Sequence, residues 1–261
     1  MLKIGGWERM FEALPLFAGG IFGAAAGVGL VHHATYAVRS QWLGPTVWRG
    51  RADTASVALT FDDGPSEDTE RVLDVLDRYS LRAAFFMVGR EVERRTRTAR
   101  RVADAGHEIG NHSYSHPVYL YRGACETRRQ LERTQEIIAD ATGVRPTLAR
   151  PPCGVRTPAY FRAVRALGLQ TVQWTLAGFD WKRRTPARIA RDVLRRVGAG
   201  SIILLHDGDS ENRADRAATV AALPLIIEGL QEKGLRVAPL SQLIETNAFH
   251  EAQTMKEADH A

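Results

Sequence analysis

The feature that most limits the possible folds is a regular alternation of short apolar runs with longer amphipathic stretches, which begins near residue 54. Several of the apolar runs are rich in β-branched and aromatic residues, as strands are. These seven runs lie at residues 57–61, 83–88, 108–110, 147–149, 169–174, 201–205 and 235–239. The sequence therefore predicts about seven strands.

Stretches with helical periodicity fill the gaps between these runs, at residues 70–79, 91–105, 125–141, 159–167, 187–197 and 217–233. Two of them have a start signal, because Thr157 and Thr185 each precede a proline at the first helical position. Strands that alternate with helices favour parallel pairing through right-handed crossovers. The predicted fold class is α/β, either an incomplete barrel or an open doubly wound sheet.

Residues 1–50 lack this alternation and are predicted to be a separate segment. Residues 13–31 contain no charge over nineteen positions, close to the ~20 residues that span a bilayer. Five glycines, five alanines and Pro15 make the stretch weakly apolar. A membrane anchor or a cleaved signal peptide is favoured over a helix packed on the domain. The predicted organisation is this segment with its connector (1–50), a folded domain (51–246) and a polar tail (247–261).

Two adjacent carboxylates end the first predicted strand, in the sequence TFDDGP at residues 60–65. Successive side chains of a strand point to opposite faces, so Asp62 and Asp63 need a local twist to share one site. If they share it, one carboxylate can bind a metal ion while the other handles a proton. Asp-Asp-Gly is also ordinary turn chemistry, so this motif predicts a site only in combination with others.

Two histidines follow the third predicted strand, in the sequence HSYSH at residues 112–116. If the segment is helical, His112 and His116 lie on one side of a turn and can reach one ion. Two histidines and one aspartate would leave a coordination position open for water, as catalytic metal sites require.

Three further polar residues follow later strands. Arg150 stands before two prolines and could clamp a carboxylate through a bidentate fork, Asp180 stands between two aromatic residues, and His206 ends a buried apolar run. Each alone has a structural explanation. Together with the aspartate and histidine pairs, however, they all fall at or just beyond C-terminal strand ends, where α/β folds build active sites. The joint pattern predicts one active site.

The motifs TFDDGP, HSYSH, RPPCG, FDW and LLHDG, in this order, resemble those of the NodB-type polysaccharide deacetylase family, which is carbohydrate esterase family 4. The resemblance covers about residues 52–246, and the first two motifs together are highly specific. It implies a distorted (β/α) barrel that hydrolyses N- or O-acetyl groups on chitin, chitooligosaccharide, peptidoglycan or xylan.

The resemblance also implies roles for individual residues. Asp63, His112 and His116 resemble the metal ligands of the family. Asp62 resembles the catalytic base, and Arg150 resembles the residue that pairs with that base.

On the other side of the expected site, His206 resembles the general acid and Asp180 the partner that tunes it. Trp181 and Leu204 resemble walls of the acetyl pocket. The backbone N–H of Cys153 resembles an oxyanion donor. The family often has an aromatic residue where Cys153 stands, a departure that bears on substrate choice rather than on the reaction.

The implied function is that of a metal-dependent hydrolase of linear amides, which removes N-acetyl groups from chitooligosaccharide or peptidoglycan and releases acetate and a free amino sugar. Zinc is the default ion because an open site with three protein ligands is typical of it. Cobalt, nickel and manganese are also compatible with the ligand set. The alternatives are a deacetylase or deformylase of a lipid-linked sugar, an acetyl-xylan esterase, and, in a different class, a non-catalytic carbohydrate-binding protein.

Composition adds few constraints. The net charge of +5 fits membranes or cell-wall polymers as well as nucleic acid. The basic stretches at 90–101 and 182–196 have no interleaved aromatic residues, so solvated helix faces are expected rather than nucleic-acid binding. Two cysteines, Cys125 and Cys153, do not make a disulfide framework. No obligate protein partner is evident, and the expected location is the membrane, with the catalytic domain extracytoplasmic, or outside the cell.

Overall fold

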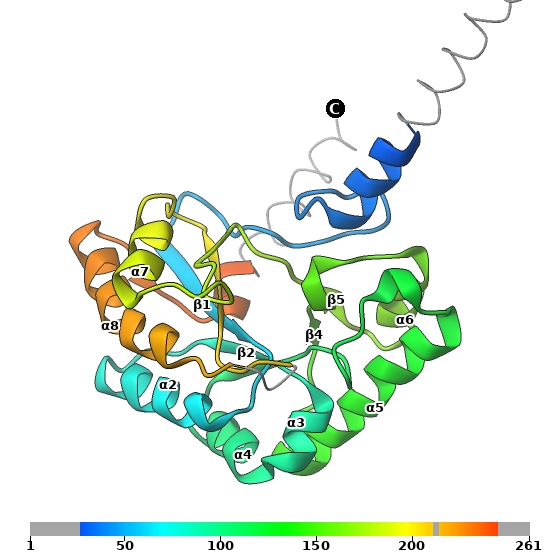
Figure 1. Ribbon diagram of the computed structural model, residues 1–261, viewed down its shortest axis with the longest axis horizontal. Coiled ribbons are helices and arrows are strands. Elements are labelled where there is room, and N and C mark those ends of the chain that lie inside the picture. The colour runs from blue at the N-terminus through cyan, green and yellow to red at the C-terminus, as the bar shows by residue number, and fades with distance from the viewer. Residues whose placement is uncertain (1–26, 211–213, 245–261) are drawn as a thin grey trace, which may run out of the picture.

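The computed structural model describes residues 27–210 and 214–244, and its centre is a curled parallel sheet, as Figure 1 shows. The strands are β1 (Ser56–Asp62), β2 (Ala84–Met87), β3 (Glu108–Asn111), β4 (Leu148–Ala149), β5 (Gln170–Thr171), β6 (Leu176–Ala177), β7 (Ile202–His206) and β8 (Arg236–Val237). Seven of them follow the order β5-β4-β3-β2-β1-β7-β6, and β8 pairs with the start of β1. Every pairing between these strands is parallel. The predicted α/β class and distorted barrel are confirmed.

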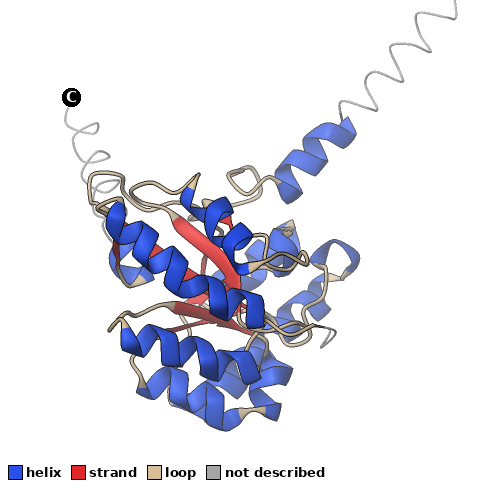
Figure 2. Cartoon of the chain, turned by 60° about the vertical axis from the view of Figure 1, so that its left-hand side comes forward, coloured by secondary structure: helices blue, strands red, loops and turns tan. Residues whose placement is uncertain are grey.

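Helices surround the sheet (Figures 1 and 2). They are α2 (Glu67–Arg78), α3 (Gly89–Arg94), α4 (Thr96–Asp104), α5 (Ala124–Thr142), α6 (Pro158–Ala166), α7 (Pro186–Leu194) and α8 (Ala217–Glu232). Thr157 and Thr185 cap α6 and α7 through their side chains, as the Thr-Pro pairs predict. Ser66 begins α2 earlier than the apolar period indicates, because it forms a capping box with Thr69.

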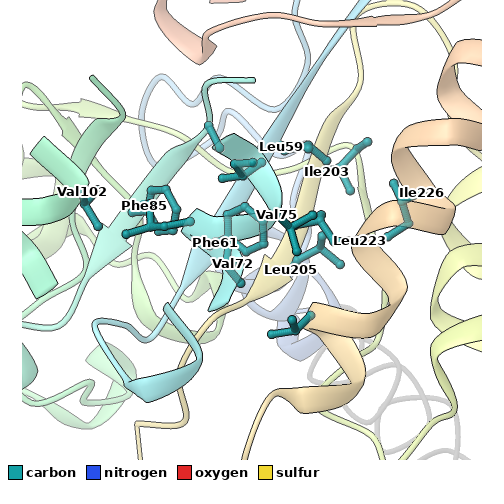
Figure 3. Close-up of a cluster of buried hydrophobic side chains, with 14 of the residues drawn as sticks. Leu59, Phe61, Val72, Val75, Phe85, Val102, Ile203, Leu205, Leu223 and Ile226 are labelled. Atoms are coloured by element: carbon teal, nitrogen blue, oxygen red, sulfur yellow. The ribbon is translucent and has the colours of Figure 1, made fainter. Parts of the chain in front are cut away.

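Alternate side chains of strand β1 pack into two different parts of the core, one on each face of the sheet. Leu59 and Phe61 pack with Val72 and Val75 of α2 and with Leu223 of α8 on the outer face, as Figure 3 shows. Burying each such side chain contributes roughly 2 kcal/mol to folding. The alternate positions of the strand face the inside of the barrel.

Two departures from the predicted elements have local causes. The helix expected over residues 91–105 is divided, because Arg95 leaves helical geometry with φ −131° and ψ 50° between α3 and α4. Strand β6 was not predicted, because its two residues lie just beyond the run at 169–174 and form no separate apolar run of their own.

The predicted connector at residues 32–50 lies against the barrel. Arg156 is 1% exposed and donates hydrogen bonds to the backbone carbonyls of Ser40, at 3.1 Å, and of Ala37. Val47 pairs with Val172 beside β5. The connector is therefore attached by backbone acceptors around one buried guanidinium.

A helix at residues 27–36 precedes this contact and projects from the body of the protein (Figure 2). Most of the uncharged segment predicted at 13–31, and the whole predicted tail at 247–261, lie outside the described residues. Within the described ranges, none of the helices combines the length and the apolar character that a membrane span needs.

Candidate active site

The C-terminal ends of the strands surround a cavity of about 380 Å³. Eight of the ten predicted site residues line it: Asp62, Asp63, His112, His116, Cys153, Trp181, Leu204 and His206. The remaining two, Arg150 and Asp180, lie behind this wall, where each is bonded to a lining residue. The structure therefore brings all the predicted residues together.

The two aspartates share the site because the chain twists between them. Asp62 follows the inward parity of Thr60 at the end of β1, and Asp63 has a left-handed backbone with φ 75°. Gly64 allows this turn, because a Cβ atom there would lie 2.1 Å from Oδ2 of Asp207. The twist that the sequence requires is thus present at the second aspartate.

Asp63, His112 and His116 form a group whose ligand atoms all lie within 4.8 Å of one another. Nε2 of His112 lies 3.5 Å from Oδ1 of Asp63, and Nε2 of His116 lies 3.2 Å from the same oxygen. Nδ1 of His112 lies 2.8 Å from the carbonyl oxygen of Arg150, which can only accept. Nδ1 therefore carries the proton in neutral His112, and Nε2 presents a lone pair to the site.

This arrangement fits a bound cation. Oδ1 of Asp63 is buried and accepts no hydrogen bond from another described residue, although two imidazole nitrogens face it. A buried carboxylate oxygen without a donor is costly unless a positive charge satisfies it. The donor set of two imidazoles and one carboxylate suits zinc and similar divalent ions.

The pKa values of the three residues depart from their usual values in different directions. Burial lowers the pKa of His112, but the carboxylates of Asp62 and Asp63 raise it more. Burial raises the pKa of Asp63, but His112, His116 and His206 outweigh it and hold that pKa below its usual value. Burial lowers the pKa of His116 to about 4, so its imidazole is neutral and can act as a ligand near pH 7.

The histidine segment is a loop and not the helical turn that would explain the spacing. Ser113 and His116 have left-handed backbones, with φ 67° and φ 56°. Side chains from neighbouring elements hold the loop: Oδ1 of Asn111 accepts the N–H of Ser113, and Oε1 of Gln130 accepts the N–H of Ser115. The helical interpretation was wrong, but the two rings still meet, with centroids 5.0 Å apart.

Arg150 pairs with Asp62 inside the barrel. Its Nη1 donates to Oδ1 of Asp62 at 2.7 Å and to Oγ1 of Thr60 at 2.8 Å, and its Nη2 donates to the carbonyl of Gln173 at 2.9 Å. Only one nitrogen reaches the carboxylate, so the predicted bidentate fork is wrong. The second nitrogen is occupied by backbone, which fixes the guanidinium in place.

On the opposite wall, Asp180 holds His206 through two contacts. Oδ1 accepts from Nδ1 of His206 at 2.9 Å, and Oδ2 accepts from the backbone N–H of His206 at 2.7 Å and from the hydroxyl of Thr219 at 2.9 Å. Burial alone would lower the pKa of His206, but Asp180, with smaller contributions from Asp63 and Asp62, raises it to about 9. The imidazole is therefore protonated near pH 7, with Nε2 as its remaining donor.

The predicted wall residues surround this histidine and the metal group. The Trp181 ring meets the His206 ring edge to face, with centroids 5.3 Å apart, and Leu204 is buried beside the cavity. Cys153 has a left-handed backbone with φ 55° and lines the cavity. Cys153 and Cys125 are both exposed and free, so they form no disulfide.

Sequence reasoning missed several residues at the cavity. Trp174, Ser210 and Arg216 line it, and no motif marks their positions. Asp207 lies behind the Asp62–Asp63 turn, where its Oδ2 accepts from the Thr69 hydroxyl. Its place directly after His206 in the LLHDG motif was the one signal that could have found it.

Comparison with known proteins agrees with this geometry. A family model described as polysaccharide deacetylase matches residues 49–172. The peptidoglycan-N-acetylglucosamine deacetylase of Bacillus cereus is 36% identical over 199 residues, which cover 76% of this chain and 71% of the relative. The chitooligosaccharide deacetylase of a Bradyrhizobium species is 36% identical over 199 residues, which cover 73% of this chain and 91% of the relative.

The chain is also similar in structure to a solved deacetylase. A crystal structure of a peptidoglycan N-acetylglucosamine deacetylase with bound 4-naphthalen-1-yl-N-oxidanyl-benzamide superimposes with a TM-score of 0.73 at 34% identity. The match covers 77% of this chain and 93% of that chain.

Proposed function

Since the chain belongs to the polysaccharide deacetylase family, and is thus a hydrolytic deacetylase, we propose that it removes N-acetyl groups from N-acetylglucosamine-containing glycans with the help of one divalent metal ion. The products are acetate and a free amino sugar. One observation carries the proposal: the Asp62 carboxylate paired with Arg150 and the His206 imidazole paired with Asp180 line the same cavity as the Asp63, His112 and His116 group.

Asp63, His112 and His116 would hold the ion, and zinc is the first candidate for it. A divalent ion bound there would lower the pKa of water and polarise the acetyl carbonyl. Both histidines are oriented by hydrogen bonds. The Arg150 carbonyl accepts from Nδ1 of His112, and Oγ of Ser113 accepts the backbone N–H of His116 at 3.1 Å, which restrains the loop that carries His116.

Asp62 is the proposed general base, acting through Oδ2. Its Oδ1 is taken by Arg150, while Oδ2 lies 3.7 Å from Nε2 of His112 and so faces the ligand group. A water molecule next to that group would give its proton to Oδ2 as it attacks the acetyl carbon. Arg150 fixes the carboxylate and balances its charge in the buried site.

His206 is the proposed general acid, acting through Nε2. Nδ1 is held by Asp180, so Nε2 is the nitrogen left to protonate the leaving amine. The pKa of about 9 keeps this proton in place at neutral pH. The backbone N–H of Cys153 would donate to the oxyanion, and Trp181 and Leu204 would enclose the acetyl methyl group.

We also propose that residues 1–50 direct the chain to or across a membrane, and that residues 51–246 act outside the cytoplasm, where the peptidoglycan substrate named for a relative lies. The support is the described start of the first helix, where Val28 and Val31 are 70% and 64% exposed. Apolar side chains exposed together indicate an apolar neighbour. Recovery of the full chain in the soluble fraction, with its N-terminus intact, would contradict this proposal.

Acetate release from chitooligosaccharides, peptidoglycan and acetyl-xylan tests the function directly. We expect release from the first two substrates, and release that is slower by about 10³-fold with the Asp62→Asn variant. Binding of a glycan without release by the wild type would instead support a non-catalytic carbohydrate-binding protein. Release from acetyl-xylan alone would move the assignment to an esterase.

A further inference from the structure

We propose that a basic surface beside the cavity binds carboxylate groups along the glycan strand, so that the enzyme selects an anionic glycan over a neutral one. This surface consists of seven cationic side chains, which we call the basic rim: Lys182, Arg183, Arg184, Arg188, Arg191, Arg195 and Arg196. The inference rests on the proposed function and concerns which substrate that site takes.

The basic rim concentrates the charge of the chain. Residues 182–196 contain seven cationic side chains and one acidic one, a net charge of +6, whereas the whole chain carries +5. The remainder of the chain is therefore close to neutral. Most of the rim residues are exposed on and around α7. Such a one-sided field attracts polyanions and falls with ionic strength.

Pairing distinguishes the basic rim from the other basic stretch, at residues 90–101. There, Glu91 contacts Arg90, Arg94 and Arg95 as ion pairs, so much of the charge is balanced. Arg101 is balanced by Glu70 and Asp74 on α2. The two stretches have the same character in the sequence, but their surroundings differ in the structure.

In the basic rim, Asp192 is the acidic partner, and it is shared by Arg184 and Arg188. No acidic side chain among the described residues forms an ion pair with Lys182, Arg183 or the rim arginines beyond these two. Burial lowers the pKa of Arg196, and its neighbours Arg195 and Arg184 lower it further, as expected in an unbalanced positive field.

An aromatic contact joins the basic rim to the cavity wall. Nζ of Lys182 and the guanidinium carbons of Arg184 and Arg196 lie 5.4, 5.1 and 4.8 Å from the centre of the Phe179 ring. That ring lies 5.3 Å from the Trp181 ring, which lines the cavity. Three cations are thus gathered around one ring by cation–π contacts, next to the wall of the reaction site.

A polymer substrate would extend onto the surface around the cavity mouth, and the basic rim adjoins one side of that mouth through Trp181. A cavity of about 380 Å³ holds a small part of a glycan, so most of a strand must lie on the surface around its mouth. Trp181 is 43% exposed and offers a ring to a sugar unit as the strand leaves the cavity. The cations beyond it are mostly arginines, whose planar forks bind carboxylates in two-pronged contacts.

The test compares two double variants of the full chain. Lys182→Gln/Arg183→Gln removes two charges from the basic rim, and Arg162→Gln/Arg165→Gln removes two exposed charges from α6, on the other side of the barrel (Figure 1). KM and kcat are measured on soluble peptidoglycan strands, which carry peptide carboxylates, and on neutral chitohexaose, at low and high salt. Co-sedimentation with phosphatidylglycerol vesicles is measured in parallel.

The rim variant is expected to raise KM for peptidoglycan by roughly fivefold at low salt, with kcat and the chitohexaose constants nearly unchanged. High salt should raise KM of the wild type toward that of the rim variant, and the α6 variant should resemble the wild type. Equal KM values for the rim variant and the wild type would overturn the inference. An equal rise in KM of the rim variant on both substrates would also overturn it. So would a loss of vesicle binding with an unchanged KM, because that result would assign the surface to lipid binding. Failure of the wild type to release acetate from either substrate would instead sink the proposed function.

Discussion

Arg150 and Asp62 form an ion pair that is closed off from solvent, with Nη1 and Oδ1 2.7 Å apart and the arginine side chain fully buried. The other carboxylate oxygen faces the three proposed metal ligands. The two oxygens of Asp62 therefore differ in role: Oδ1 is held by Arg150, and Oδ2 can accept a proton.

Asp62→Asn should lower kcat by about 10³-fold, because the amide cannot accept the proton of the attacking water. Bound metal, measured by mass spectrometry, should stay close to one ion per chain. The unpaired Arg150 should cost about 3 kcal/mol in the free energy of unfolding. Asp63→Asn is the matched control and should lose the metal, so loss of metal from both variants would refute the division of roles.

His116→Ala should release the ion, because two ligands remain where three converge. Prolonged dialysis of the wild type against a chelator should give the same inactive protein, and added zinc should restore activity to the wild type only. Unchanged metal content in the variant would remove His116 from the ligand set.

Asp180→Asn should move the alkaline limb of the pH–kcat profile toward lower pH. His206 must be protonated to act as an acid, so activity falls as pH rises through its pKa of about 9. Without the carboxylate, burial lowers that pKa, and kcat near pH 7 should fall by about 10²-fold. An alkaline limb that does not move would mean that another group supplies the proton.

His107 should make folding sensitive to acid, away from the active site. Its Nδ1 accepts the backbone N–H of Ala83 at 3.2 Å, and burial lowers its pKa from 6.5 to about 4. As pH falls from 6.5 toward 4, the unfolded chain binds a proton that the folded chain refuses, so stability decreases across that window. Urea unfolding of wild type and His107→Gln at several pH values measures this.

The His107→Gln variant should be less stable than the wild type at pH 7, and the difference should shrink by about 1–2 kcal/mol as the pH drops. The active-site histidines titrate in both proteins and cancel in the comparison. A difference that is constant with pH would contradict the assignment.

The sequence could predict that the proposed site residues lie together, because most of them follow strands. Strand ends are marked by apolar runs, and parallel strands bring their C-terminal ends to one edge, so Asp62 and His206 could be placed together before any coordinates. Arg216 could not be placed, since it belongs neither to a motif nor to a strand end, and Trp174 ends the predicted run at 169–174 but belongs to no motif that would mark it as a site residue.

The local geometry was harder to predict for a physical reason. Ser113 and His116 adopt left-handed backbones that non-glycine residues rarely take. The loop is held by side-chain oxygens of Asn111 and Gln130, which accept the N–H groups of Ser113 and Ser115, and Gln130 reaches the loop from α5 only once the fold has formed. The single-nitrogen contact of Arg150 likewise depends on the backbone of a neighbouring strand segment. Residue types were enough to predict the proposed roles, whereas the backbone dihedral angles and side-chain contacts depend on tertiary structure.

The environment of Arg156 determines how far the chain can be trimmed. A fragment that starts at residue 49, where the family match begins, keeps every residue of the reaction centre but removes the carbonyls of Ala37 and Ser40 that surround this guanidinium. Its melting temperature should fall by roughly 4–8 °C, for a loss of about 2 kcal/mol, relative to a fragment that starts at residue 33. The segment needed for full stability thus begins earlier in the chain than the segment that contains the proposed site residues.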